Sequence, residues 1–132
     1  MSKKIKLGVV GDPIDHSLSP LIHSKFGALN GMEIDYQPYH VVQKDLIEFI
    51  KNFFYKGGHG LNITLPHKLN CVHAADILSS DVELLGAANT LSKNKDEQIV
   101  ASSTDGLGLI RDCSDKNIEI SNKRVLILGA GG

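Results

Sequence analysis

Apolar and polar residues alternate along the chain in blocks that predict strands and helices in turn. Residues 5–11 form a short apolar run that ends at a Gly-Asp-Pro turn, which indicates a buried strand. Residues 44–58 place apolar side chains at helical spacing and end in two glycines, which indicates an amphipathic helix. Segments with a strand pattern and segments with helical spacing alternate along the rest of the chain.

The remaining segments complete the pattern. Pro38 predicts an edge position for its strand, and Ser19 and Pro20 are the expected N-cap and first residue of the first helix. Alternating strands and helices predict an α/β fold, with a mainly parallel open sheet and helices on both faces. Strands are expected over 34–42, 59–64, 87–93, 98–104 and 123–132, and helices over 19–31, Pro66 to about Asp76, a further piece to Leu85, and 105–116.

Composition narrows the class of protein. A chain of 132 residues with 42% hydrophobic and 22% charged residues is typical of one soluble domain. The net charge of -1 includes no basic stripe, so no nucleic-acid partner is expected. No apolar run is long enough for a signal peptide or a membrane span, so we expect a cytoplasmic protein without a membrane partner. Cys71 and Cys113 lack metal or redox spacing and are expected to be free thiols.

The stretch NITLPHK, residues 62–68, places polar side chains at the end of a strand. Asn62 and Thr64 share one face, because alternate side chains of a strand point the same way. Lys68 is expected in the first helical turn, where a cation is disfavoured and therefore indicates a function. Ligands of open α/β sheets bind at such strand ends. Alternatively, Asn62 and Thr64 cap the next turn and Lys68 is solvated; this stretch alone leaves both readings open.

Other polar residues lie at similar junctions. Ser17 and Ser19 precede a helix start, where hydroxyl and backbone N–H groups suit a carboxylate or phosphate, although simple capping is favoured for each alone. Asn89 follows a glycine helix stop, and Asp105 joins a strand to a helix. Turn and cap roles explain both, whereas a functional Asp105 would pair with a lysine across the cleft.

The sequence contains six histidines and a glycine-rich end, which bear on two further types of site. No pair of histidines has the i, i+4 spacing with a carboxylate that a metal site needs, so no metal is predicted. The chain ends in LILGAGG, an apolar strand followed by glycines. Gly129 and Gly131 would give the tight turn and the close approach to a pyrophosphate, but a glycine pair alone is weak evidence.

Taken together and in this order, these stretches resemble the shikimate dehydrogenase family over nearly the whole chain. NITLPHK resembles the most diagnostic motif of that family, which ends in the catalytic lysine. Ser103 stands where the family usually has Asn, and Ala88 replaces a commoner larger apolar residue, but neither carries a chemical role. The similar segments are GDPIDHSLSP (11–20), NITLPHK (62–68), GAANT (86–90), STDGLG (103–108) and LGAGG (128–132).

The resemblance implies an organisation and a set of residue roles. Residues 1–106 would form a substrate-binding catalytic domain, and 107–132 an inter-domain helix with the first strand and glycine loop of a Rossmann domain. Lys68 and Asp105 would form the catalytic pair. Ser17 and Ser19 would hold the substrate carboxylate, Asn62, Thr64, Asn89 and Asp105 would surround the ring hydroxyls, and Gly129, Ala130, Gly131 and Gly132 would contact NADP.

The implied activity is the NADP-dependent, reversible reduction of 3-dehydroshikimate to shikimate in aromatic amino-acid biosynthesis. Hydride transfer to a ketone builds negative charge on its oxygen, and Lys68 would supply the proton while Asp105 orients it. A quinate-accepting dehydrogenase and a non-catalytic module for polyhydroxy carboxylates are the alternatives. A tetrahydrofolate-linked dehydrogenase shares the two-domain plan but gives no reason for the paired serines.

The resemblance also implies a C-terminal half that this sequence does not include, with the rest of the NADP site. We therefore expect the 132-residue chain by itself neither to turn over nor to bind NADP tightly. The apolar edge of the last strand, Val125 to Leu128, would be mobile, pair with another chain or be covered by a second copy, so a homodimer is one expected arrangement. The choice between NADP and NAD stays open.

Overall fold

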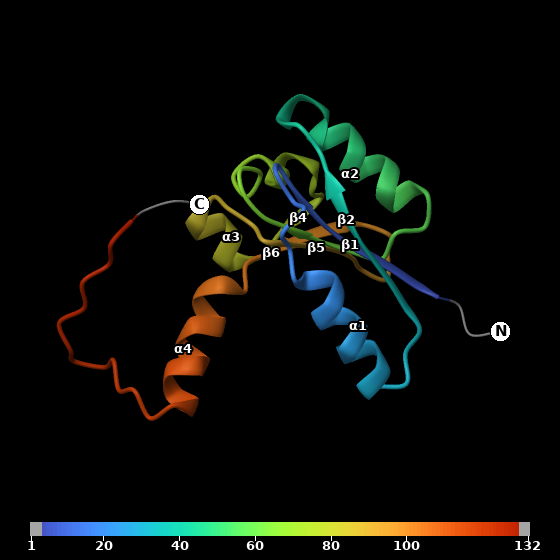
Figure 1. The fold of residues 1–132 in the computed structure, drawn as a ribbon. Coiled ribbons are helices and arrows are strands. Elements are labelled where there is room, and N and C mark those ends of the chain that lie inside the picture. Colours follow the sequence, from blue (N-terminus) through green and yellow to red (C-terminus); the bar gives the residue numbers. More distant parts are fainter. Residues whose placement is uncertain (1–3, 130–132) are drawn as a thin grey trace.

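The computed structural model describes residues 4–129, which form a six-stranded sheet with helices on both faces (Figure 1). Helix α2 covers one face, and α1 and α4 extend from the other. The strands, in the sheet order β2-β1-β3-β5-β6-β4, are β1 (Ile5–Gly11), β2 (Ile34–His40), β3 (Gly60–Ile63), β4 (Ile77–Leu78), β5 (Thr90–Lys93) and β6 (Ile99–Ser102). The helices are α1 (Ser19–Leu29), α2 (Leu46–Tyr55), α3 (Ser80–Leu85) and α4 (Asp105–Asp115), with 3₁₀ turns at Gln43–Asp45 and Cys71–Ala74.

The strand directions confirm the predicted α/β fold. Strand β1 is parallel to β2 and β3, and β4 is parallel to β6. Strand β5 runs antiparallel to both β3 and β6. The short polar turn that joins β5 to β6 explains the second of these pairs, because such a connection requires antiparallel strands. The sheet is therefore mixed, although most of its pairings are parallel. Strand β2, which contains Pro38, lies at the edge as predicted.

The main core lies between α2 and the sheet. Leu46, Ile50 and Phe54 of α2 are buried against Leu61 and Ile63 of β3. Burial of these alternate residues of β3 leaves the intervening Asn62 on the opposite face. The alternation that predicted a polar face on this strand is thus confirmed, and that face opens toward the ends of the neighbouring strands.

The helix predicted from Pro66 to about Asp76 is wrong. The chain instead forms turns at 65–66 and 68–70, which are followed by the 3₁₀ turn Cys71–Ala74 and then by the short strand β4. The reason lies in His67, whose buried side chain contacts the carbonyl oxygen of Val41 and draws this segment toward the end of β2. Lys68 consequently lies in a turn, and its expected place in a helix N-terminus is also wrong.

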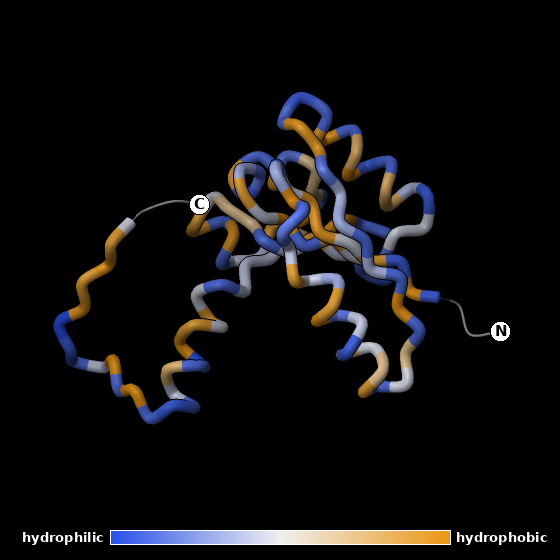
Figure 2. The backbone as a smooth tube through the Cα atoms, in the orientation of Figure 1, coloured by the Kyte–Doolittle hydropathy of each residue, from blue (hydrophilic) through white to orange (hydrophobic). Residues whose placement is uncertain are grey.

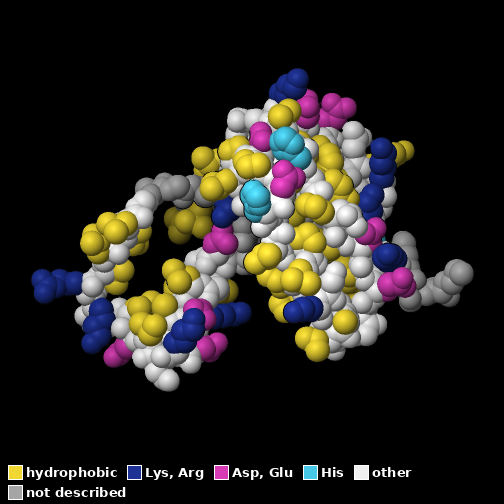
Figure 3. All heavy atoms as spheres, viewed as in Figure 1, with side chains coloured by type: hydrophobic (Ala, Val, Ile, Leu, Met, Phe, Trp, Pro, Cys, Tyr) yellow, Lys and Arg dark blue, Asp and Glu magenta, His cyan; other side chains and the backbone are white. Residues whose placement is uncertain are grey.

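Two further details of the prediction change. The N-cap of α1 is Leu18, and Ser19 is its first helical residue; the Ser19 N–H donates to Ser17 Oγ over 3.3 Å. The predicted last strand, Val125–Leu128, is not formed: its side chains are 65–89% exposed, and no described strand pairs with it. A single strand cannot satisfy its backbone groups without a neighbour. Figure 2 shows this apolar segment in a stretch of chain that lies apart from the sheet, and Figure 3 shows its side chains standing clear of the body.

Candidate active site

A polar cavity of about 250 Å³ lies beyond the carboxyl ends of β1 and β3. A second cavity of about 260 Å³ adjoins it and shares Val9, Ser19 and Thr64 with it; Ser17 lines this second one. The structure therefore brings all the predicted substrate-binding residues to one cleft. The first cavity is lined by Val9, Ser19, His23, Asn62, Ile63, Thr64, Lys68, Asn89 and Asp105.

A larger hollow of about 440 Å³ lies elsewhere, between α4 and the segment that follows it. Its walls are mostly exposed residues of 110–121, and none of the predicted site residues reaches it. The cavity of about 250 Å³ is the candidate functional site, because polar side chains of separate elements converge there.

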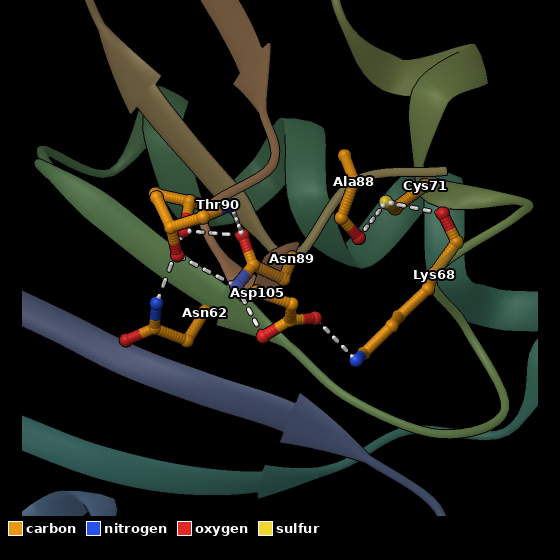
Figure 4. Close-up of polar contacts among 8 residues, drawn as sticks. Asn62, Lys68, Cys71, Ala88, Asn89, Thr90 and Asp105 are labelled. Carbon is orange, nitrogen blue, oxygen red and sulfur yellow. Dashed lines mark hydrogen bonds and ion pairs between the residues drawn. The ribbon is translucent and has the colours of Figure 1, made fainter. Parts of the chain in front are cut away.

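Lys68 and Asp105 meet at one end of the cleft. The Lys68 Nζ donates to Asp105 Oδ2 over 2.7 Å, and the lysine side chain is 22% exposed (Figure 4). Lys68 comes from the turn after β3, whereas Asp105 is the first residue of α4. The carboxylate also lies at the helix N-terminus, where backbone N–H groups favour negative charge. A half-buried ammonium is thus held next to a carboxylate at the cavity wall.

Asn89 holds the other oxygen of this carboxylate. Its Nδ2 donates to Asp105 Oδ1 over 3.0 Å and to Thr104 Oγ1 over 2.8 Å, while its Oδ1 accepts the Thr104 N–H over 3.1 Å. Asn89 directly precedes β5, so these bonds tie the start of that strand to the start of α4 (Figure 4). Each oxygen of Asp105 therefore has its own donor, and the carboxylate has a defined orientation.

Asn62 is held in a similar way, by residues that the sequence did not identify as functional. The Tyr36 hydroxyl donates to Asn62 Oδ1 over 2.8 Å, and Asn62 Nδ2 donates to Thr90 Oγ1 over 3.3 Å. Burial raises the pKa of Tyr36 to about 12, with a smaller opposing effect from a hydrogen bond to the Ser19 side chain. Tyr36 was not among the predicted site residues. Its place on an edge strand gave no signal of this contact.

Hydrogen bonds with buried residues fix the main chain at Lys68. The fully buried His67 donates through Nε2 to the Val41 carbonyl oxygen over 2.6 Å, and its Nδ1 has no hydrogen-bond partner. The Lys68 carbonyl oxygen accepts the Ala88 N–H over 2.9 Å and the Cys71 thiol over 3.4 Å. Burial raises the pKa of Cys71 to about 11, which keeps this thiol protonated. Neither His67 nor Cys71 was expected to support the site.

The serine loop reaches the cleft at the end of β1. The Ser17 N–H donates to the Ile14 carbonyl oxygen over 3.1 Å, which closes a tight turn. Gly11 permits a close approach to the end of β3, since a Cβ at this position would lie only 2.6 Å from Thr64 Cγ2. A larger residue at position 11 would push the serine loop away from Thr64.

Helices of residues 4–129 are all too short or too polar to span a lipid bilayer. The same residues contain no group of three or more His, Cys, Asp or Glu side chains arranged to hold a metal ion. The absence of a metal from the function, like the absence of a membrane partner, stays a prediction.

The fold and cleft define a class: an α/β domain with a polar cleft at its strand ends, next to a lysine–carboxylate pair. The family profile described as the shikimate dehydrogenase substrate binding domain matches residues 9–91. The chain belongs to this family, as the resemblance of its motifs predicted.

Curated relatives and solved structures agree with this assignment. The chain is 43% identical over 125 residues to a shikimate dehydrogenase (NADP(+)) of Marinobacter nauticus, covering 94% of this chain and 46% of the relative. It spans about half the length of the curated relatives it matches. Shikimate 5-dehydrogenase of Listeria monocytogenes, solved with shikimate and NAD, superimposes with a TM-score of 0.91 at 32% identity, covering 98% of this chain and 44% of that one. The 5-ketofructose reductase of a Gluconobacter strain superimposes with a TM-score of 0.86 at 26% identity, covering 98% of this chain and 46% of that one.

Proposed function

We propose that this chain is the substrate-binding domain of an NADP-dependent shikimate dehydrogenase, which interconverts 3-dehydroshikimate and shikimate in aromatic amino-acid biosynthesis. The contact between Lys68 and Asp105 in a cleft lined by hydroxyl and amide groups carries the proposal. Family membership and the named activity of the relatives support it. A cytoplasmic location is part of the same proposal.

The two ends of the cleft suit the two ends of this substrate. A carboxylate accepts hydrogen bonds only, and Ser17 and Ser19 offer hydroxyl donors at the end of β1. Ring hydroxyls both donate and accept, and the amides of Asn62 and Asn89 can satisfy both roles. The ring would lie between them with its reacting carbon near Lys68.

The catalytic step is a proton transfer at Lys68 Nζ. The reduced cofactor, NADPH, when bound, would supply the hydride for reduction of the ring ketone. As negative charge develops on the ketone oxygen, the Lys68 ammonium donates its proton to that oxygen. Asp105 accepts a hydrogen bond from Nζ and so directs the remaining protons, while Asn89 keeps the carboxylate in place. In the oxidation of shikimate, the neutral amine of Lys68 accepts the hydroxyl proton.

The described part of the nucleotide loop is compatible with NADP. Gly129 has φ +118°, which glycine adopts without strain. Ala130, Gly131 and Gly132, the other predicted contacts, lie outside the described residues. Residues 118–129 form no helix or strand, so we expect the chain alone to bind NADP weakly.

Domain organisation follows the same proposal. Helix α4 has no buried residue, which supports a boundary near residue 106 between the substrate domain and a connecting segment. The exposed apolar side chains of 125–128 fit a segment that another part of the protein covers. A homodimer that covers them stays a prediction, and sedimentation analysis of the chain at several concentrations tests it.

The proposed function has a direct test in ligand binding. Titration calorimetry of the chain with shikimate should give measurable binding, with quinate weaker and NADP undetectable at micromolar concentrations. Activity is measured in a fusion of this chain to the nucleotide-binding half of the Marinobacter nauticus relative, as NADPH formed from shikimate. A chain that binds no shikimate, together with an inactive but folded fusion, contradicts the proposal.

A second candidate is the reduction of a polyhydroxy ketone without a carboxylate, because a 5-ketofructose reductase has the same fold. Ser17 and Ser19 discriminate between the two. A carboxylate would accept charge-assisted hydrogen bonds from both hydroxyls, whereas a neutral polyhydroxy ketone lacks that charge and would depend on them less. The double variant Ser17→Ala/Ser19→Ala of the fusion should therefore lose activity on shikimate, and equal activity of both forms on 5-ketofructose would favour the second candidate.

A further inference from the structure

One run of side-chain hydrogen bonds crosses the cleft floor. The Tyr36 hydroxyl donates to Asn62, Asn62 donates to Thr90, and the Thr90 hydroxyl donates to Asn89 Oδ1 over 3.0 Å. Asn89 continues to Asp105, and Asp105 to Lys68. Tyr36 reaches across β1 to join this run, which links β2, β3, β5 and α4 through side chains alone.

The tyrosine sets the direction of the run at one end. Its phenol is protonated at neutral pH and donates to Asn62 Oδ1, which leaves the NH₂ group of Asn62 facing Thr90. His23 stacks on the ring of Tyr36, with centroids 4.3 Å apart and an angle of 11° between the ring planes. This contact holds the phenol in place.

A backbone group sets the direction at the other end. The Thr104 N–H can only donate, and it donates to Asn89 Oδ1. The NH₂ group of Asn89 must therefore face Asp105, and a flipped amide would place its oxygen against the carboxylate, where two acceptors repel. Both ends require the same pattern at Thr90, which accepts from Asn62 and uses its single hydrogen toward Asn89. Only a hydroxyl can occupy this position and satisfy both neighbours.

We infer that Tyr36 and Thr90 are positioning residues that hold the amides of Asn62 and Asn89 in one orientation for the substrate. The consequence for catalysis rests on the proposed function, whereas the orientation of the two amides does not. Loss of the hydroxyl at either position frees an amide to rotate. Ordering that amide again on binding costs conformational entropy, which lowers the affinity for the ligand. Neither residue needs to touch the substrate for this effect.

Four variants of the chain test the inference. Tyr36→Phe and Thr90→Val each remove one hydroxyl with little change in shape, and Thr90→Ser restores the hydroxyl. Tyr39→Phe removes a hydroxyl from the same strand, outside the run, and is the matched control. Thermal unfolding first shows that each variant folds. The readouts are the NMR signals of the side-chain NH₂ groups of Asn62 and Asn89, and the shikimate affinity from calorimetry.

The expected pattern is specific. Tyr36→Phe moves the Asn62 NH₂ signals and weakens shikimate binding about five- to tenfold, the scale of one hydrogen bond. Thr90→Val moves both pairs of amide signals, whereas Thr90→Ser and Tyr39→Phe resemble the wild-type chain in signals and affinity. A merely structural role would lower the unfolding temperature without this selectivity for the two amides.

Other results overturn the inference. If Tyr36→Phe and Thr90→Val leave the amide signals and the shikimate affinity unchanged in a wild-type chain that binds shikimate, the positioning role is wrong and the proposed function stands. If the wild-type chain binds no shikimate and the folded fusion is inactive, the proposed function is wrong and the amide signals alone decide. Shifted signals then support the fixed orientation, and unshifted signals overturn it.

Discussion

The two ends of the cleft are built differently. At the Lys68 end, buried side chains hold the main chain, and both oxygens of Asp105 have donors. At the serine end, Ser17 lies in the loop before α1 and Ser19 is the first residue of that helix. The side-chain hydrogen bonds described there are that between the Ser19 N–H and Ser17 Oγ and that between Asp12 and His40 at the start of the loop. Leu18, between the two serines, is 68% exposed.

This difference matches the demands of the two tasks. Proton transfer requires a donor within hydrogen-bond distance and in line with the accepting oxygen, so a small displacement costs rate. Binding of a carboxylate tolerates small displacements, because a hydroxyl can rotate to follow its partner. We therefore expect substitutions at the Lys68 end to affect the rate or the fold, and those at the serine end to affect affinity.

The largest effect is expected for Lys68→Ala in the active fusion. Without the proton donor, kcat should fall by about two to four orders of magnitude, with little change in KM. Lys116→Ala is the matched control, since Lys116 pairs with Asp112 on the surface of α4. A Lys68→Ala enzyme that keeps most of its kcat removes this residue from the mechanism.

Truncation of the buried imidazole under Lys68 should be the next largest effect. His67→Ala leaves a cavity and an unpaired Val41 carbonyl oxygen, so the free energy of unfolding should fall by about 2–4 kcal/mol. Chemical denaturation of the chain measures it. His73→Ala, at an exposed position of the same segment, should change stability by less than about 0.5 kcal/mol. Equal effects of the two substitutions would mean that the buried His67 side chain does not stabilise the Lys68 turn.

At the serine end, the double substitution Ser17→Ala/Ser19→Ala should act on affinity. Loss of two hydroxyl donors should raise KM for shikimate by a factor equivalent to about 1–3 kcal/mol, with a smaller change in kcat. Kinetics of the fusion and thermal unfolding of the chain are measured together. A double variant that unfolds but binds shikimate normally when folded would assign these serines to capping alone.

The smallest effect is expected for Leu18→Ala. Because the side chain is mostly exposed, its truncation should change the free energy of unfolding by less than about 0.5 kcal/mol. A loss above about 1 kcal/mol in the isolated chain would show that the serine loop packs more firmly than its exposure suggests, and would weaken the contrast between the two ends.

Much of the fold was predictable, because local periodicity carried it. Helix α2 and strands β1 and β3 follow from the spacing of apolar residues, and Pro38 correctly indicated the edge strand. The segment after Pro66 was mispredicted as a helix. Its conformation depends on the burial of His67 against Val41, a residue 26 positions earlier, and no local pattern encodes that contact.

The sequence by itself also determined which side chains can carry the chemistry: the lysine, the aspartate, the serines and the amides stand at predicted element ends. Only the tertiary structure decided how they meet. Lys68 and Asp105 are 37 positions apart in the sequence. Tyr36 and Asn62 lie on two strands of the same sheet with only β1 between them, so the tyrosine can reach across β1 to the amide. Periodicity reports the face on which a side chain lies, whereas hydrogen-bond partners depend on strand order and on distances of a few ångströms. The sheet order therefore created the run of hydrogen bonds from Tyr36 to Lys68.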